Sequence, residues 1–360
     1  MGFAALNPSC VRAMPLSLAR LPVTISPAAP AWSDMKRRTF IKLLGGAAAS
    51  GPRMAGAQEA GKLARIGFLG SGSAAGSTRS VDALRKGLDE RGHRVGQNIS
   101  IEFRWAEGDY NRLAGLAAEL VGLKVDVLVT HGTPGTLAAR QATSSIPVVM
   151  AISGDAPLTG LVTNLARPEA NVTGSTYFLS ELNAKRLQWL HDIFPAFTRI
   201  AALSNPGNPI SGPIMTAMET MAANLKISVE QFKVGAASEF ETAFTAMGPG
   251  RIDAVVVTED GEFAASHRMI SELAAANRLV SIGATEFASA GGLIGYGANI
   301  LELYRRAGYF VDRIIKGARP ADLPVERPAT FELVINLKTA RMIGSAIPPS
   351  VLLLANDVIE

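Results

Sequence analysis

Short apolar runs that end in Gly, Ser, Asn or Asp recur along the chain. Residues 64–72 read ARIGFLGSG, and residues 125–136 read VDVLVTHGTPGT. Runs of the same form follow at 146–155, 198–209, 252–263 and 279–287. Continuous apolar runs are typical of strands that are buried on both faces, as in a parallel sheet covered by helices. The pattern therefore predicts two successive sets of buried parallel strands.

Stretches with helical periodicity separate these runs. In residues 77–92, Val81, Leu84 and Leu88 share one face, and Gly92 suits the end of a helix. Asp109 is expected to cap a second helix. The inner face of that helix is expected to carry Leu113, Leu116, Ala117 and Leu120.

Two later segments carry further helix signals. Ser238 and Glu241 have the spacing of a capping box, and Gly248 is expected to end the helix that they begin. Residues 300–317 read ILELYRRAGYFVDRIIKG and predict an amphipathic helix. Its apolar stripe is expected to consist of Leu301, Tyr304, Ala307, Phe310, Val311 and Ile314.

The apolar runs have the same spacing in the two halves of the chain. The distance from Ile66 to Ile146 and the distance from Ile200 to Val280 are both 80 positions. Repeated strand–helix units of this kind predict an α/β fold with two doubly wound parallel-sheet lobes and a hinge. We expect lobe 1 to hold residues 58–177 and 298–327, and lobe 2 to hold residues 178–297 and 328–360.

Residues 35–60 read MKRRTFIKLLGGAAASGPRMAGAQEA and combine a basic start, a weakly apolar run and an alanine pair. These are the parts of an export signal, and the adjacent Arg37 and Arg38 resemble a twin-arginine signal. We interpret residues 1–57 as an upstream extension and a cleaved signal peptide, with Met35 as the natural start. The run is too short for a spanning helix, so a periplasmic, soluble protein is expected.

Charge and cysteine content change once this segment is set apart. The whole chain has 35 Lys and Arg against 31 Asp and Glu, but beyond residue 57 the counts are 28 and 30. The part of the chain beyond residue 57 is therefore slightly acidic and has no basic patch. This composition argues against nucleic-acid binding. The single cysteine, Cys10, lies in the upstream part, so no disulfide or thiolate metal site is expected.

In open α/β sheets, ligands bind at the carboxyl ends of the strands. This rule selects polar residues in the loops after the runs, to which two neighbouring aromatic residues are added. The candidate ligand-binding residues are Ser71, Gly72, Ser73, His131, Thr133, Ser153, Asp155, Phe178, Asn205, Asn208, Glu259, Asp260, Glu286 and Tyr296. Each could also be an ordinary turn, cap or core residue. Tyr177, Phe263 and Phe287 are further aromatic residues near the expected cleft.

Catalytic and cofactor motifs are weak by comparison. Residues 70–76 have the spacing G-x-G-x-x-x-G, one residue longer than the dinucleotide fingerprint. The four histidines are scattered without the spacing of metal ligands, and no G-x-S-x-G elbow occurs. Glu259 and Asp260 could be an acid/base pair, but adjacent residues at a strand end usually point apart. We therefore expect no catalytic residues, no metal and no cofactor.

Several stretches resemble a known family. They include GLVTNLARPEANVTG at 160–174, ELNAKRLQWL at 181–190, and the long run from Tyr296 to Gly344. The chain from Met35 to Glu360 resembles the exported substrate-binding proteins of ABC transporters, in the tryptophan/tyrosine-type family. The resemblance implies the type I periplasmic-binding-protein clamshell, a small-molecule ligand between two lobes, and a membrane permease as partner.

Two function classes remain open at this stage. The first is the exported solute-binding component of an ABC importer, expected to be a monomer without nucleic-acid partners. Its ligand would be a small organic carboxylate, plausibly an amino acid or aromatic acid, held by Ser71, Gly72, Ser73, Thr133 and Ser153. Asp260, or in its place Glu259 or Glu286, would pair an ammonium group. The second is an exported α/β enzyme or ligand-sensing domain that uses the same cleft.

Overall fold

The computed structural model describes residues 63–168, 170–248 and 250–360. The expected extension and signal peptide, residues 1–57, lie outside the described residues. Among the helices that the structure describes, none is long and apolar enough to cross a membrane.

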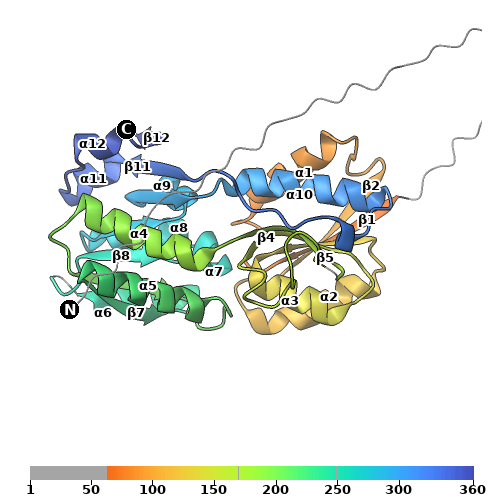
Figure 1. Cartoon of the computed structure of the whole chain (residues 1–360), viewed down its shortest axis with the longest axis horizontal. Coiled ribbons are helices and arrows are strands. Elements are labelled where there is room, and N and C mark those ends of the chain that lie inside the picture. Colours follow the sequence, from red (N-terminus) through yellow and green to blue (C-terminus); the bar gives the residue numbers. More distant parts are fainter. Residues whose placement is uncertain (1–62, 169, 249) are drawn as a thin grey trace, which may run out of the picture. The chain divides into compact units, whose positions relative to one another are not determined.

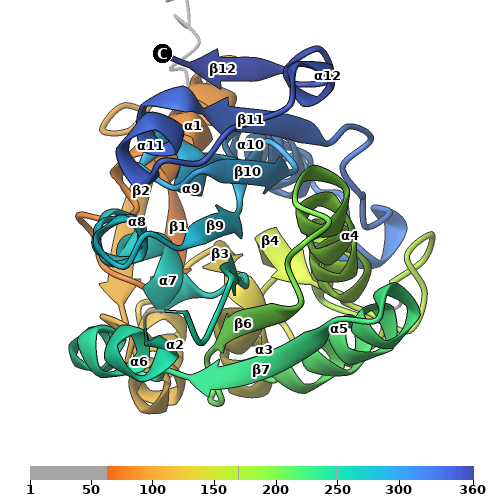
Figure 2. The same ribbon diagram turned by 90° about the vertical axis from the view of Figure 1, so that its left-hand side faces the viewer.

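Two β-sheets organise the described chain (Figure 1). The first sheet has five strands in the order β2-β1-β3-β4-β5, and the second has seven in the order β12-β11-β10-β9-β8-β6-β7. Figure 2 shows the second sheet with β12 at one edge and β7 at the other. The first five are β1 (Ala64–Gly70), β2 (Ile99–Trp105), β3 (Val127–His131), β4 (Val148–Gly154) and β5 (Val172–Tyr177). The others are β6 (Arg199–Ser204), β7 (Ser228–Lys233), β8 (Ala254–Val257), β9 (Val280–Gly283), β10 (Ile294–Gly297), β11 (Glu332–Asn336) and β12 (Asp357–Ile359).

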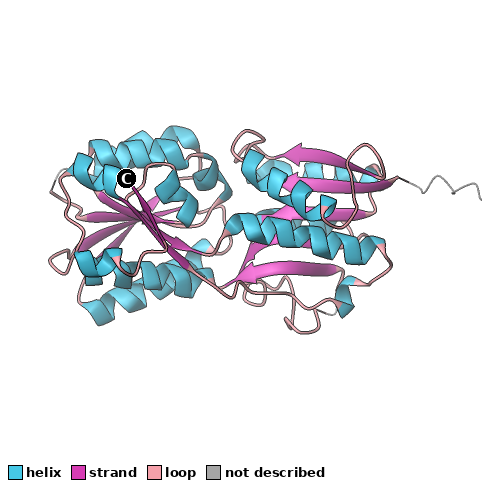
Figure 3. Ribbon diagram, turned by 90° about the horizontal axis from the view of Figure 1, so that it is seen from above, coloured by secondary structure: helices cyan, strands magenta, loops and turns pink. Residues whose placement is uncertain are grey.

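Helices cover both faces of the second sheet, as Figure 3 shows from above. The helices before the second sheet are α1 (Thr78–Asp89), α2 (Leu113–Gly122) and α3 (Gly132–Ala142). Those that follow are α4 (Leu179–Ile193), α5 (Ser211–Leu225), α6 (Phe240–Met247), α7 (Gly261–Ala265), α8 (His267–Ala276), α9 (Thr285–Ser289), α10 (Ile300–Ile315), α11 (Leu337–Ile343) and α12 (Pro349–Leu352). Short 3-10 turns are η1 (Tyr110–Arg112), η2 (Ala237–Glu239) and η3 (Pro320–Asp322).

The expected α/β fold with two sheets is confirmed, and the central strands are the apolar runs of the sequence. Every residue of β4, β8 and β9 is buried, because helices pack on both faces of these strands. The edge strands β2 and β7 differ: in β7 only Phe232 is buried. Neither β2 nor β7 is predicted from the sequence, since neither is continuously apolar.

The second sheet is not wholly parallel, because β11 pairs antiparallel with β10. The path of the chain explains the reversal. Parallel strands end at one edge, and the chain leaves β10 there for α10, which packs on α1 and the first sheet. Glu326 then pairs with Ser175 of β5 before the chain returns. A strand that re-enters at the edge where the others end must run the opposite way.

Two local predictions are wrong. Ser238 lies inside the turn η2, and the carboxylate that caps this end is Glu239, which accepts the N–H of Gly235 at 2.6 Å. Leu301 is only partly buried in α10, and Leu303 is buried instead. In each case a like residue two positions away, Glu239 in place of Glu241 and Leu303 in place of Leu301, satisfies the pattern in the register that the tertiary packing selects.

The helices α1 and α10 meet through a glycine pair. A Cβ atom at Gly308 would lie 2.5 Å from the carbonyl carbon of Gly87. A Cβ atom at Gly87 would overlap the carbonyl oxygen of Arg305. Because backbone stands on both sides, neither clash can be relieved by turning a side chain. The close approach of α10 to the first sheet therefore depends on these two glycines.

We expect Gly87→Ala to lower the free energy of unfolding by about 1–3 kcal/mol, the usual cost of overpacking. The control is Gly115→Ala, where nothing lies within 4 Å of the new methyl group. That change should stabilise the helix α2 by about 0.5–1 kcal/mol, because alanine restricts the unfolded chain. Urea denaturation measures both. Equal effects of the two substitutions would contradict the packing argument.

Candidate functional site

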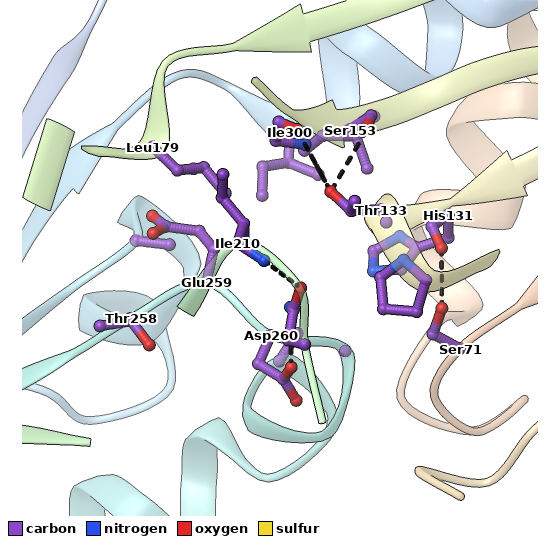
Figure 4. Close-up of a pocket in the computed structure, with 18 of the residues that line it drawn as sticks. Ser71, His131, Thr133, Ser153, Leu179, Ile210, Thr258, Glu259, Asp260 and Ile300 are labelled. Carbon is purple, nitrogen blue, oxygen red and sulfur yellow. Dashed lines mark hydrogen bonds between the residues drawn. The ribbon is translucent and has the colours of Figure 1, made fainter. Parts of the chain in front are cut away.

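A cavity opens where the carboxyl ends of the two sets of strands face each other (Figure 4). Its empty space is about 630 Å³, part of which is open to solvent. Residues from β3, β4, the start of α3 and the loop after β1 form one wall, and residues from the loops after β6, β8 and β9 form the other. We call this cavity the cleft. Its polar side chains include Ser71, Tyr110, His131, Thr133, Ser153, Tyr177, Asn208, Glu259, Asp260 and His267.

The first wall is built around the start of α3. Gly132, Thr133 and Pro134 line the cleft, and no side chain caps this helix end. The first N–H groups of a helix lack partners within the helix and carry a partial positive charge. The uncapped end is therefore a place where a carboxylate can be held by backbone N–H groups.

The hydroxyl groups on this wall serve the protein itself. The Oγ of Ser71 donates to the carbonyl of His131 at 2.8 Å, and the Oγ1 of Thr133 accepts the N–H of Gly154 at 3.2 Å. These bonds join β1, β3 and β4 at their carboxyl ends. They fix the loops that shape the anion-binding end, rather than leaving free hydroxyl groups for a ligand.

The second wall centres on the buried carboxylate of Asp260. It accepts the hydroxyl of Tyr110 at 2.6 Å and the side-chain amides of Asn205 at 3.1 Å and Asn208 at 3.0 Å. It also accepts the N–H of Glu262 at 3.0 Å, which caps α7. Burial raises the pKa of Asp260 against the opposing effect of these donors. Four donors occupy both oxygens, so no acceptor position remains for a ligand ammonium group.

Tyr110 and Asp260 stand on opposite walls of the cleft. Tyr110 begins the turn η1 next to the first sheet, whereas Asp260 follows β8 of the second sheet. Their hydrogen bond therefore joins the two walls directly. The backbones also approach closely nearby, since a Cβ atom at Gly72 would lie 2.9 Å from the carbonyl oxygen of Gly261. We call this contact between the walls, with its hydrogen bond between Tyr110 and Asp260, the latch.

Glu259 lies beside Asp260 but points away from it (Figure 4). Its carboxylate pairs with Arg186 at 2.5 Å and accepts the amide of Asn183 at 2.8 Å. Arg186 is fully buried and also donates to the carbonyl of Tyr296. Because the two carboxylates are separately engaged, they do not form an acid/base pair. The Glu259 side chain keeps 14% of its surface exposed, so its carboxylate can still accept a hydrogen bond from a group in the cleft.

Two histidines face the cleft from opposite walls. His131 ends β3 and makes a hydrogen bond to the hydroxyl of Tyr304, and His267 begins α8 with its ring 5.6 Å from that of Phe287. Burial lowers the pKa of each to about 4. Arg186 adds to the effect at His267. Both imidazoles are therefore neutral near pH 7.

The structure brings together half of the candidate residues. Those that line the cleft are Ser71, His131, Thr133, Ser153, Asn208, Glu259 and Asp260. Asn205 supports Asp260 from behind, and Gly72 forms part of the contact between the walls. Ser73 accepts the N–H of Gly76, and the carbonyl of Asp155 accepts from Thr159. These last two therefore serve their own loops.

The remaining candidates lie elsewhere. Glu286 accepts the hydroxyl of Thr285, and burial raises its pKa. Phe178 and Tyr296 line a different cavity, which shares only Tyr177 with the cleft. Phe263 and Phe287 are fully buried in the core. The assignment of all fourteen candidates to ligand binding stays a prediction.

Sequence reasoning missed Tyr110 and His267. Tyr110 sits beside the expected cap Asp109, in a loop that carries no strand-end signal of its own. Its partner Asp260 is 150 positions away, so no local pattern relates the two. His267 follows the short helix α7, and no residue pattern in this stretch indicates that the helix ends at Ala265. Among the described residues, no group of three or more His, Cys, Asp or Glu is placed to hold a metal ion.

The sequence of this chain matches a family model and a protein of known name. The family model described as ABC transporter substrate binding protein matches residues 72–359. The tyrosine-binding protein of Clostridioides difficile (strain R20291) is 28% identical over 267 residues, which are 73% of this chain and 76% of that protein.

Solved structures give the same fold. An ABC domain from Streptococcus pneumonia in complex with L-Trp is 28% identical, with a TM-score of 0.75 over 82% of this chain and 99% of that one. A conserved domain protein from Vibrio cholerae is 24% identical, with a TM-score of 0.77 over 82% of this chain and 100% of that one. The second similarity shows the fold alone.

The lowered histidine pKa values generate a pH prediction. Between about pH 6.5 and pH 4 the unfolded chain takes up a proton at His267 that the folded protein refuses, so stability falls as the pH falls. The pKa shift to about 4 corresponds to about 3 kcal/mol at the lower pH. We expect His267→Gln to remove this loss, measured as the difference in unfolding free energy between pH 7 and pH 4. Parallel pH profiles for wild type and variant would contradict the burial argument.

Proposed function

Since this chain belongs to the ABC transporter substrate-binding protein family, we propose that it is the exported solute-binding component of an ABC importer and that its ligand is an aromatic amino acid. Two relatives support the ligand class: one is named for tyrosine, and the other is a complex with L-Trp. Both are only 28% identical to this chain, so we infer the identity of its ligand from the residues that line the cleft.

The observation that carries the proposal is the placement of hydrogen-bond donors and a carboxylate acceptor on opposite walls of the cleft. The uncapped start of α3 offers N–H groups on one wall, and Glu259 offers a partly exposed carboxylate on the other. Among the described residues that line the cleft, none is a lysine or an arginine. A ligand with a carboxylate at one end of a short unit and an ammonium group at the other matches this arrangement. An α-amino acid has that form.

The rest of the lining suits an aromatic side chain. Ile152, Leu179, Ile210 and Ile300 supply apolar surface, and Tyr177 adds an aromatic ring. The neutral imidazole of His267 can face a ring without carrying a charge into the cleft. Most small-molecule sites combine such an apolar lining with a few placed polar groups. Relative to the sequence-based hypothesis, the ammonium partner changes from Asp260 to Glu259, because the donors around Asp260 leave it no free position.

The alternative of an exported enzyme receives no support from the cleft. The carboxylates of Glu259 and Asp260 are held by separate partners, and the hydroxyls of Ser71 and Thr133 bond to backbone groups. None of them is paired with a base in the manner of an activated nucleophile. Binding without turnover, export through the signal at 35–57, a monomeric state and delivery to a membrane permease together form the proposed function.

Matched ligands test the proposal. L-tryptophan carries both charged groups, tryptamine lacks the carboxylate, and indole-3-propionate lacks the ammonium group. Because a lost hydrogen bond to a charged group costs about 1.5–3 kcal/mol, each analogue should bind about ten- to a hundredfold more weakly than L-tryptophan. Isothermal titration calorimetry measures the three affinities, with glucose and spermidine as negative controls. If tryptamine bound as tightly as L-tryptophan, the carboxylate subsite at α3 would be wrong.

The latch between the walls gives a second prediction. Tyr110→Phe removes the hydroxyl that reaches Asp260 but keeps the ring. We expect ligand to dissociate about tenfold faster with little change in the association rate, since most interface changes act on dissociation. Stopped-flow fluorescence with L-tryptophan measures both rates. Tyr309→Phe on α10, outside the cleft lining, is the matched control and should behave as wild type. Equal dissociation rates for Tyr110→Phe and Tyr309→Phe would contradict a role of the Tyr110–Asp260 hydrogen bond in retaining the ligand.

A further inference from the structure

A second cavity lies at the hinge. It is lined by Tyr177, Phe178, Glu181, Leu182, Lys185, Tyr296, Arg327, Pro328, Ala329 and Phe331, and its empty space is about 1100 Å³. These residues come from the first crossover after β5, from the first two turns of α4, from β10 and from the last crossover before β11. We call it the hinge pocket. Nothing in the proposed function uses it.

Aromatic rings dominate its walls. Tyr296 and Phe331 are stacked, with ring centroids 6.1 Å apart and planes at 24°. Phe331 keeps 41% of its surface exposed, although burial would be favourable for a side chain of this size. Phe178 stands at the other crossover, directly before α4. A flat ligand could therefore cover Phe331 and extend the stack that Tyr296 begins.

Two cations line the pocket without a carboxylate partner among the described residues. The guanidinium of Arg327 lies 4.7 Å from the centroid of Phe178. Lys185 donates to the side chain of Gln188 and lies 5.6 Å from the ring of Trp189. Within the described part of the chain, neither cation makes an ion pair. An arginine that is held over a ring and lacks a counter-ion is well placed to bind an anion.

The hinge pocket is also connected to the cleft. Tyr177 lines both cavities and is itself buried, so it forms a shared wall. The residues on either side of the pocket belong to two of the segments that run between the sheets, and such hinge segments absorb the backbone changes when lobes open and close. A ligand that touches Phe178 and Arg327 together would hold both segments in their present arrangement.

We propose that the hinge pocket is a second binding site, for a flat aromatic ring that carries an anionic group, and that its occupation is coupled to the cleft. The stacked rings of Tyr296 and Phe331 receive the aromatic part, and Arg327 and Lys185 receive the anion. Because the bound ligand holds the crossovers in the arrangement in which Tyr110 reaches Asp260, it raises the affinity of the cleft. Coupling between two sites is reciprocal, so a cleft ligand also strengthens binding at the hinge. The coupling rests on the proposed function, whereas the hinge site does not.

The probe for the site is 2-naphthoate, titrated calorimetrically into the full exported protein. We expect Phe331→Ala and Arg327→Gln each to weaken its binding about tenfold or more, by loss of the ring contact and of the charged donor. Arg313→Gln, an exposed residue of α10 outside the pocket, is the control with the same change of charge and should leave binding unchanged. Because Phe331 and Arg327 are exposed, both variants should unfold at the temperature of the wild type.

Three results would overturn the hinge site. They are no binding of 2-naphthoate to the wild type, equal binding by the wild type and both pocket variants, and displacement of 2-naphthoate by saturating L-tryptophan. The last would place the probe in the cleft. If the site stands, saturating 2-naphthoate should raise the affinity for L-tryptophan about fivefold or more. An unchanged affinity would refute the coupling. If L-tryptophan did not bind at all, the proposed function would be refuted. The hinge site would still be tested by the binding of 2-naphthoate to Phe331→Ala and Arg327→Gln.

Discussion

The buried carboxylate of Asp260 is the constraint around which the cleft is built. A buried charge is costly unless hydrogen-bond donors replace the water that it has lost. The protein supplies two amides from the loop after β6 and one N–H from the start of α7. The fourth donor, Tyr110, comes from the other wall. Complete replacement of water around this charge therefore requires the two walls to be together.

This dependence suits the proposed binding protein, which would have to open to load and release its ligand. When the walls separate, water can take the place of the Tyr110 hydroxyl, so the net gain from the bond is modest. The three donors on the second wall keep Asp260 satisfied in either state. The ligand can then shift the equilibrium toward joined walls, because it adds contacts that exist only when both walls are near. A latch that was much stronger would hold the empty protein closed and prevent loading.

The sequence predicts the middle of each sheet well and its margins poorly, for one physical reason. Strands such as β4 and β8 are covered on both faces, so each appears in the sequence as an unbroken apolar run. The edge strands β2 and β7 are covered only in part and carry mixed residues. The reversal at β11 depends on how the chain crosses between sheets, which is a property of the path rather than of the segment FELVIN.

The site was predictable as a place but not as a set of contacts. The rule that ligands bind at strand ends leads to the loops of Ser71, Thr133 and Asp260, and all three line one cavity. It cannot show that their polar atoms are already engaged, because the partners His131, Gly154 and Tyr110 are distant in sequence. Phe178 and Tyr296 have the right chemistry for a ligand and lie in the hinge pocket instead. Proximity to a strand end does not say on which side of a crossover a ring will lie.

We propose that an amino acid binds with its carboxylate at the start of α3 and its ammonium group toward Glu259. A crystal structure of the protein with L-tryptophan would reveal this arrangement. We expect the ligand carboxylate within hydrogen-bond distance of the backbone N–H groups of Gly132 and Thr133, with the bond between Tyr110 and Asp260 intact. A carboxylate bound away from α3, or a ligand-bound protein in which Tyr110 and Asp260 are apart, would contradict it.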